Sequence, residues 1–315
     1  MLEEYYKEKE KRREQGLPAL PLTAEQVQAI ADLFEKGEGS DELLILLENE
    51  VPPGVDEAAY VKAAFLKDLA LENILTNLIP PQKAIAMLGT MLGGYSVEAL
   101  VAVLKVNKFG AEVASALKHT ILVYDSFNDI FDLQDENEHA KEIINSWANA
   151  DWFSSKPKLE KEIELTVYKV SGETNTDDFS PAKEAWSRPD IPLHAQAFLK
   201  WSENISDPLE KLTELKKDNS KLAFVGDVVG TGSSRKSAAN SMLWHMGDEI
   251  PFVPAKKTGG FCFGNKIAPI FYNTLQDSGA FPVELDVDAL EHGRKIILKP
   301  YDGQILDASS KEIIT

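Results

Sequence analysis

The sequence predicts two domains of different fold class, an all-helical domain over residues 1–157 and a mixed β/α domain over residues 158–315. In the first, apolar residues recur every three or four positions, which is helical spacing. The polar stretch 154–158 then marks a boundary, and beyond it polar and apolar residues alternate over 162–170, as they do in a β-strand. Segments of strand and helix character alternate from there on, which favours a sheet covered by helices.

In the helical domain, most expected helices start at a residue suited to capping. Thr23 and Gln26 form a capping box, and Ser40, Asp56 and Ser96 stand where an N-cap is expected. The expected helices are 2–15, one after Thr23 that stops at Gly37, one from Ser40 through Leu47, one from Asp56 through Leu69, one from Pro80-Pro81 to Gly93-Gly94, one from Ser96 through Leu104, and two near 113–127 and 136–147. Successive helices joined by short turns indicate a HEAT-like α-solenoid, with an irregular helical bundle as the alternative.

The second domain is expected to alternate strands and helices to its end. The expected elements are a strand at 162–170, helices at 194–203 and 208–217, a strand at 222–225, a helix at 234–246, a strand at 260–263, a helix at 268–277, and strands near 281–286 and 294–299. The last strand, a turn at Asp302-Gly303 and residues 313–315 resemble a hairpin that stops in mid-element. We therefore expect the chain to be part of a longer protein, with this domain truncated at its C-terminus.

Charge and hydropathy limit the location and the partners of the chain. The formal net charge is −18, which argues against non-specific binding of nucleic acid through a basic face. No apolar run approaches the roughly 20 residues that cross a bilayer, so we expect no membrane partner. The N-terminal segment is charged and lacks an apolar signal region, which makes a cytoplasmic location the expectation.

The cysteine and histidine residues do not form a metal site by their spacing. Cys262 is the single cysteine, so no disulfide can form within the chain, in keeping with a reducing compartment. Its aromatic and glycine neighbours predict a small buried apolar side chain. The histidines are scattered, without partners at ligand spacing. We therefore predict no metal ligands in this chain.

The run 222–240 carries the clearest functional signal. An apolar strand leads into a glycine-rich turn, and Ser233, Ser234 and Arg235 follow where a helix begins. Free N–H groups and the helix dipole make such a helix start an anion site, and hydroxyls and a guanidinium suit a carboxylate or phosphate. The Walker and dinucleotide-binding patterns that start at Gly230 both fail because they require glycine where Arg235 stands. The run thus predicts a site for a small polyanion, with a serine-rich helix cap as the alternative.

Two loops of the second domain carry a family resemblance. The motif Gly230-Thr-Gly-Ser-Ser-Arg235 resembles the substrate-binding serine–arginine loop of the aconitase superfamily. The stretch 172–182, followed by Trp186-Ser-Arg-Pro-Asp190, is similar to the loop that opens the swivelling domain of those enzymes and supplies a second arginine. The resemblance extends over the whole chain and is to the bacterial B-type aconitases, in which a HEAT-like helical domain precedes the swivelling β/α domain.

The resemblance implies the N-terminal part of an aconitate-hydrating lyase of the tricarboxylic acid cycle. Aconitases interconvert citrate and isocitrate through cis-aconitate, and 2-methylisocitrate fits the same chemistry. By the resemblance Ser233 is the catalytic base, and Arg188, Ser233, Ser234 and Arg235 bind the carboxylates of the substrate. Aconitases hold a 4Fe-4S cluster with three cysteines. One cysteine cannot do this, so the cluster is expected on domains absent from this chain, and the chain alone is expected to be inactive.

The expected partners follow from the same resemblance. They are a tricarboxylate substrate, the cluster-bearing domains of the same enzyme, a second copy of the helical domain in a homodimer, and messenger RNA. Residues 1–158 hold 15 Lys and Arg against 27 Asp and Glu, which leaves little electrostatic basis for RNA and favours protein contact. Two alternatives remain. One is a stand-alone small subunit, or a protein- or RNA-interaction module, that joins a separate cluster-bearing subunit; the other is a tricarboxylate-binding protein without a partner.

Overall fold

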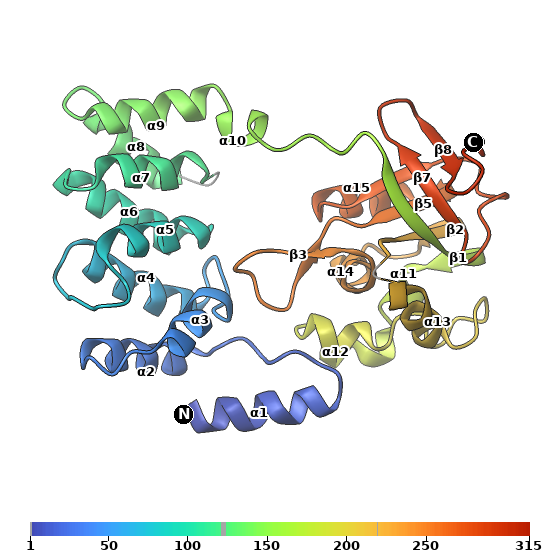
Figure 1. The fold of residues 1–315 in the computed structure, drawn as a ribbon, viewed down its shortest axis with the longest axis horizontal. Coiled ribbons are helices and arrows are strands. Elements are labelled where there is room, and N and C mark those ends of the chain that lie inside the picture. The colour runs from blue at the N-terminus through green and yellow to red at the C-terminus, as the bar shows by residue number, and fades with distance from the viewer. Residues whose placement is uncertain (1, 121–123, 219) are drawn as a thin grey trace. The chain divides into compact units, whose positions relative to one another are not determined.

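The computed structural model describes residues 2–120, 124–218 and 220–315 (Figure 1). The chain divides into two compact units, one of residues 1–157 with 251–254 and the other of residues 158–250 with 255–315. The described part of the first unit is helical, and the second contains a mixed sheet with helices. The predicted fold class, a helical region followed by a β/α region, is confirmed. The HEAT-like type of the helical region stays a prediction.

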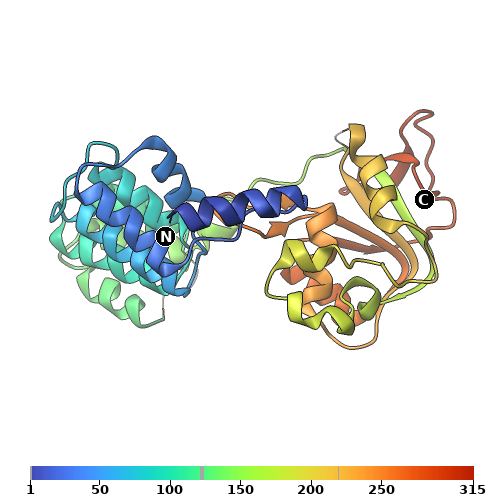
Figure 2. The same ribbon diagram turned by 90° about the horizontal axis from the view of Figure 1, so that it is seen from below.

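The helical unit is a stack of short helices around one apolar core. Its helices are α1 (Leu2–Glu14), α2 (Ala24–Glu35), α3 (Asp41–Asn49), α4 (Glu57–Ala70), α5 (Pro81–Thr90), α6 (Gly94–Val106), α7 (Gly110–Lys118), α8 (Tyr124–Leu133), α9 (Glu138–Ala148) and α10 (Asp151–Ser154). Helices α2 to α9 follow one another through the stack in Figure 1, and Figure 2 views the same helices from below. Val27, Leu66, Leu100 and Ile143 lie fully buried in the core. Burial of this shared core, rather than helix propensity, stabilises helices of this length.

The capping predictions hold at three helix starts. The Thr23 capping box is present, and the side chains of Ser40 and Asp56 accept from the backbone of α3 and α4. Ser96 was expected to cap a helix and does not. Helix α6 begins two residues earlier with Gly93 as its N-cap, and the Ser96 hydroxyl is buried and donates to the Gly93 carbonyl at 2.9 Å.

Two further observations concern helix boundaries in this unit, and the second corrects a prediction. The backbone of Gly54 approaches Gly93 so closely that a Cβ at Gly93 would lie 2.3 Å from the Gly54 carbonyl oxygen, which is why glycine stands at that helix start. The helix expected over 113–127 is two helices, because α7 ends at Lys118 and α8 begins at Tyr124. Its residues 121–123 lie outside the described residues.

The second unit is built on a six-stranded sheet. Its strands are β1 (Ile163–Asn175), β2 (Leu222–Thr231), β5 (Phe261–Ile267), β6 (Phe281–Glu284), β7 (Lys295–Lys299) and β8 (Gln304–Asp307), in the order β6-β5-β2-β1-β7-β8. The four strands from β6 to β1 are parallel, and β7 and β8 are each antiparallel to their neighbour. A separate ladder joins β3 (Asp248–Glu249) to β4 (Lys257–Thr258).

Helices cover one face of this sheet. They are α11 (Thr176–Phe179), α12 (Ile191–Ala195), α13 (Pro208–Leu215), α14 (Lys236–Met246) and α15 (Pro269–Asp277), with 3₁₀ turns at Ala182–Ser187 and Lys216–Asp218. Beneath them Phe179 packs its ring against Phe198, Phe224 and Phe271, with centroids 5.2–5.5 Å apart. Val225, the next residue along β2, belongs to a second apolar cluster with Val287 and Leu290. The alternation of Phe224 and Val225 separates the two faces of the sheet.

The structure corrects three element boundaries in this unit. Strand β2 continues past Gly226 and Gly230 to Thr231 because β1 and β5 pair with it on both sides. The helix expected over 194–203 ends at Ala195, and Leu199 takes a left-handed φ of 57°. The C-terminal hairpin joins β7 to β8, whereas Ile313 only forms a bridge back to Leu306.

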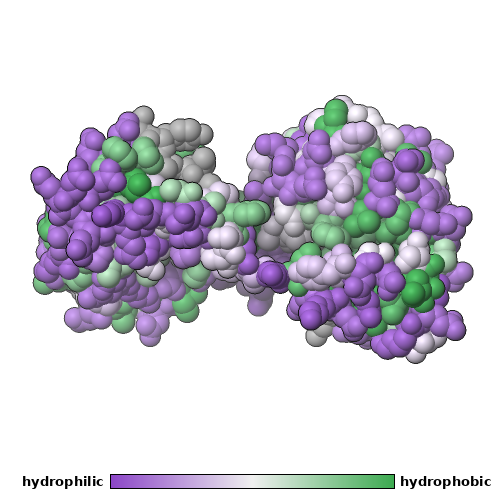
Figure 3. Space-filling view, turned by 90° about the horizontal axis from the view of Figure 1, so that it is seen from above, coloured by the Kyte–Doolittle hydropathy of each residue, from purple (hydrophilic) through white to green (hydrophobic). Residues whose placement is uncertain are grey.

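Hydropathy is drawn for one face of the molecule in Figure 3. The face of the molecule in Figure 3 is largely hydrophilic, with scattered apolar side chains. In the described ranges, no helix combines the length and the hydropathy needed to span a membrane.

Gly230 gives a test of how tightly β2 is packed. Its φ is +77°, and a Cβ there would lie 2.1 Å from the Cδ1 atom of Phe271. Gly303 also has a positive φ, of +64°, but nothing lies within 4 Å of a Cβ at that position. We expect Gly230→Ala to lower the free energy of unfolding by about 2–5 kcal/mol and Gly303→Ala by about 1 kcal/mol. Chemical denaturation measures both, and equal losses would show that Phe271 imposes no restriction.

His245 on α14 makes the stability of this unit depend on pH. Its Nε2 atom donates to the Ala195 carbonyl at 2.8 Å, and burial lowers its pKa from 6.5 to about 4. Below pH 6.5 the imidazole of His245 is protonated in the unfolded state but stays neutral in the folded state. The contribution of neutral His245 to the free energy of unfolding is therefore complete above pH 6.5 and is lost as pH falls toward 4.

We expect the wild type to lose about 2 kcal/mol more than His245→Gln between pH 7 and pH 5, since one pKa unit corresponds to about 1.4 kcal/mol. Glutamine keeps a hydrogen-bond donor without the titration. Denaturation of both proteins at the two pH values measures the difference, and parallel losses would contradict the assignment.

Candidate functional site

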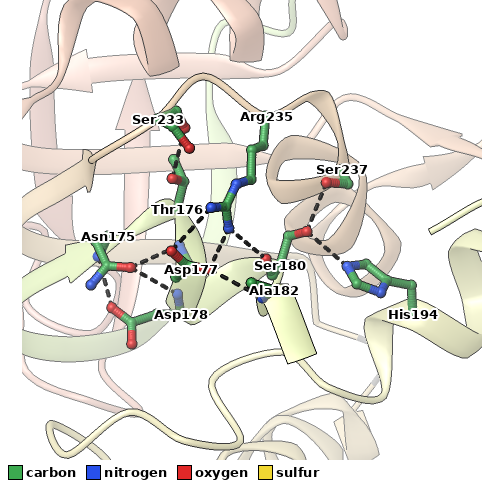
Figure 4. Close-up of polar contacts among 10 residues, drawn as sticks. All are labelled: Asn175, Thr176, Asp177, Asp178, Ser180, Ala182, His194, Ser233, Arg235 and Ser237. Carbon is green, nitrogen blue, oxygen red and sulfur yellow. Dashed lines mark hydrogen bonds and ion pairs between the residues drawn. The ribbon is translucent and has the colours of Figure 1, made fainter. Parts of the chain in front are cut away.

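The candidate site lies where β1 and β2 end. The two strands are neighbours and run parallel, with Asn175 paired to Thr231 at the last position, so their carboxyl ends meet at one edge of the sheet. Helix α11 follows β1 directly, and the loop 232–235 leads from β2 into α14. Such edges are where open α/β sheets place their ligands. Figure 4 shows the side chains that gather there.

Arg235 is tied to α11, the short helix that directly follows β1. It is the N-cap residue of α14, and its two Nη atoms donate to the two carboxylate oxygens of Asp177, the Nη2–Oδ2 distance being 3.1 Å. Nη1 also donates to the Ser180 carbonyl at 3.0 Å. Within the described part of the chain, Nε makes no hydrogen bond. The end of the guanidinium is thus occupied, while its Nε–Nη2 edge can take a carboxylate.

Asp177 is held as a carboxylate by these contacts. The hydrogen bond from Arg235 is the main reason that the pKa of Asp177 lies below its usual range. The Ala182 N–H, which donates at 3.1 Å, and the nearby charge of Arg188 act in the same direction. Asp177 therefore keeps its negative charge at neutral pH and fixes the orientation of Arg235.

Ser233 and Ser234 lie exposed in the loop that precedes α14. The helix was expected to begin at residue 234, but it begins at Lys236, so both serines stand before the N-cap instead of capping the helix. Neither hydroxyl makes a hydrogen bond to any described residue. The backbone, by contrast, is anchored, because the buried Thr176 hydroxyl donates to the Ser233 carbonyl at 2.8 Å. The loop is held while its hydroxyls face solvent.

Arg188 comes from the segment between the 3₁₀ turn at Ala182–Ser187 and α12. Its side chain is half-buried, and its Nε atom is buried without a hydrogen-bond partner among the described residues. Its charge lowers the pKa of both Asp177 and His194, which brings it into the same electrostatic environment as Arg235. A buried guanidinium nitrogen that lacks a partner in the described part of the protein is unusual.

The structure adds residues that sequence reasoning missed. Thr176, Asp177 and Ser180 lie in the stretch that carried the resemblance, so their position was a signal, but their contacts with residues 233–237 were not foreseen. His194 was set aside as one of several scattered histidines, yet it is buried between Ser180 and Ser187. No spacing in the sequence predicts that contact.

The residues of the chain do not fit an iron–sulfur cluster. Cys262 is fully buried in β5, and burial raises the pKa of its thiol, which disfavours the thiolate that a metal needs. Across residues 2–120, 124–218 and 220–315, no group of three or more His, Cys, Asp or Glu side chains is placed to hold a metal ion.

Thr176→Val tests whether the threonine hydroxyl holds the serine loop. Valine fills the same space without the hydroxyl, so we expect the backbone order parameters of Ser233 and Ser234 to fall from about 0.85 toward 0.6, with a stability loss of about 1 kcal/mol. Thr213→Val is the control, because it removes a bond of the same length, 2.8 Å, from the Thr213 hydroxyl to the Leu209 carbonyl within α13. NMR relaxation measures both variants, and an unchanged loop in Thr176→Val would refute the anchoring role.

Comparisons with known proteins cover both units. The family model described as "Aconitate B N-terminal domain" matches residues 4–153, and the one described as "Aconitate hydratase 2 N-terminus" matches residues 165–315. Aconitate hydratase B of Salmonella typhimurium is 50% identical over the whole of this chain, and those of Pseudomonas aeruginosa and Escherichia coli are 48% identical. The chain spans 38% of the length of each of these three relatives.

Among solved structures, a 3-isopropylmalate dehydratase from Methanocaldococcus jannaschii is similar to this chain. The match covers 48% of this chain and 79% of the dehydratase chain, with 16% sequence identity and a TM-score of 0.36. The family assignment rests on the sequence matches, which extend over both units. The chain belongs to the aconitate hydratase B family and matches its N-terminal domains.

Proposed function

We propose that this chain is the substrate-binding N-terminal part of an aconitate hydratase, a cytoplasmic lyase that interconverts citrate and isocitrate through cis-aconitate. One observation carries the proposal: Arg235 and the exposed Ser233 and Ser234, whose hydroxyls bond no described residue, stand at one sheet edge, and the charge of Arg188 acts on Asp177, the partner of Arg235. A substrate with three carboxylates supplies the anionic groups that such a site needs. 2-Methylisocitrate carries the same carboxylates and fits the same contacts.

The two arginines would bind different carboxylates of the substrate. Asp177 occupies the end of the Arg235 guanidinium, so a substrate carboxylate would approach along the Nε–Nη2 edge. Arg188 would use its partly buried guanidinium for a second carboxylate. Charge-assisted contacts of this kind are strong when they are bidentate, which explains how a chain of net charge −18 could bind an anion.

Ser233 is the proposed base. Its oxygen would take the proton from the carbon next to a substrate carboxylate, and the electron pair of the C–H bond would form the double bond of cis-aconitate as hydroxide leaves. A serine oxygen is a poor base unless its anionic form is stabilised. The N-terminus of α14 and the guanidinium of Arg235 are suited to do this.

The leaving hydroxide needs an electrophile that the described residues of this chain do not supply. We propose that a 4Fe-4S cluster on other domains of the same protein does so, since the residues here do not fit a cluster. The proposal agrees with the share of the relatives' length that the chain spans, 38%.

The helical unit is proposed to make protein contacts, in particular with a second copy of itself. Repeated helices offer extended surfaces for such contacts. Messenger RNA is the weaker proposal, because acidic residues outnumber basic ones by 27 to 15 over residues 1–158.

Replacement of Arg235 tests the proposed function. The test uses the protein that contains this chain together with cluster-bearing domains. We expect Arg235→Gln to lower kcat/KM for isocitrate by a factor of about 30 to 1,000, which corresponds to a loss of about 2–4 kcal/mol of transition-state stabilisation. Arg294→Gln is the matched control, because Arg294 pairs with Asp307 at 2.8 Å away from this site. Steady-state kinetics measures both, and equal effects of the two substitutions would overturn the proposal. The 315-residue chain alone is expected to show no turnover of isocitrate.

A further inference from the structure

We propose that His194 is a positioning residue that holds Arg188 and Arg235 in one fixed arrangement. The inference rests on the proposed function for the identity of the ligand, but not for the contacts themselves. His194 is only 2% exposed, so it does not reach a ligand directly. It acts through the two segments that carry the arginines.

The imidazole joins those two segments through both of its nitrogens. Nδ1 lies 2.8 Å from the Ser187 hydroxyl oxygen, and Ser187 immediately precedes Arg188. Nε2 lies 2.8 Å from the Ser180 hydroxyl oxygen, which in turn lies 2.7 Å from the hydroxyl oxygen of Ser237 in the first turn of α14. Figure 4 shows Ser180 between His194 and Ser237.

Ser180 is the point at which the connection reaches Arg235. Its hydroxyl contacts His194 and Ser237, while its carbonyl accepts from Nη1 of Arg235 at 3.0 Å. A shift of Ser180 would therefore move the acceptor that fixes one end of this guanidinium. Since Ser180 is fully buried and Ser187 is 4% exposed, the part of the connection around His194 is enclosed in the protein, whereas Ser237 is half-buried.

The donors and acceptors along this connection have one consistent direction. Ser187 donates its single hydroxyl hydrogen to the Glu184 carbonyl at 2.8 Å, so it accepts from Nδ1–H of His194. Nε2 is then an acceptor, Ser180 donates to it, and Ser237 donates to Ser180. The imidazole must be neutral with its proton on Nδ1. Burial, and to a smaller extent the charge of Arg188, lower the pKa of His194 and favour the neutral form, whereas the carbonyl and the charge of Glu184 oppose them.

Two amide substitutions separate the two halves of this connection. Asparagine places its amide near Nδ1 and keeps the donor to Ser187, but it does not reach Ser180. Glutamine reaches the position of Nε2 and keeps an acceptor for Ser180, but it leaves Ser187 without its donor. His194→Asn should therefore disturb Arg235, and His194→Gln should disturb Arg188. His292→Gln is the control, since His292 packs against the Tyr168 ring, at 5.4 Å, elsewhere in the same unit.

The first measurement is NMR of the 315-residue chain without ligand. We expect the ¹⁵N shifts of His194 to show a protonated Nδ1 and an unprotonated Nε2 at pH 7. The Nε–H resonance of Arg235 should move in His194→Asn and that of Arg188 in His194→Gln, while His292→Gln moves neither. A proton on Nε2, or unmoved arginine resonances in variants with a native amide spectrum, would overturn the proposal.

The second measurement is citrate binding by the same proteins. Each amide variant is expected to bind citrate at least ten-fold more weakly than the wild type, and His292→Gln is expected to bind it as the wild type does. If the wild type does not bind citrate, the proposed ligand is wrong, while the arginine resonances still decide the role of His194. If the wild type binds citrate and both His194 variants bind it as tightly as the wild type does, His194 does not position the arginines.

Discussion

The parallel pairing of β1 with β2 is the constraint on which the rest of the site depends. The two strands end side by side, so the loop after β1 and the loop after β2 meet although they are more than 50 residues apart in sequence. Three hydrogen bonds then join the two segments at this edge. Asp227 accepts from the Gly172 N–H at 2.6 Å, the Thr231 hydroxyl donates to Glu173 at 2.5 Å, and Thr176 holds the Ser233 carbonyl. A change in the register between β1 and β2 would separate Asp177 from Arg235, and the side chains of the site would no longer lie together.

Charge explains why the arginines need such close support. The edge carries Glu173, Asp177 and Asp178 beside the two arginines, and burial, helped by its acidic neighbours, raises the pKa of Asp178. A site in these surroundings attracts anions little from a distance. The proposed recognition of an anion would therefore depend on short, oriented contacts, which a guanidinium fixed by a carboxylate and a carbonyl is suited to make.

The sequence predicted the features that depend on neighbours in the chain. The caps at Thr23, Ser40 and Asp56 involve residues two or three apart, and all three are present. It failed where distant residues decide. The segment after Ala195 has helical spacing, but Leu199 donates its N–H to the Asp178 carbonyl at 2.8 Å, and that contact replaces a helix. The motif identified the candidate arginines and serines, whereas Asp177 and His194 acquire their contacts only from the fold.

The candidate site divides its groups by exposure, and this division has a consequence for the proposed function. The hydroxyls proposed to meet the substrate, on Ser233 and Ser234, are exposed. Thr176, which holds their loop, and His194, which is proposed to position the arginines, are 2% exposed each. The anchoring bonds therefore form when this unit folds and do not wait for a ligand. Binding then needs little further ordering of the chain, because the conformational entropy of the loops has already been lost in folding. In the proposed function this unit carries only part of the active site, so its groups would be in place before an electrophile on other domains is brought to them.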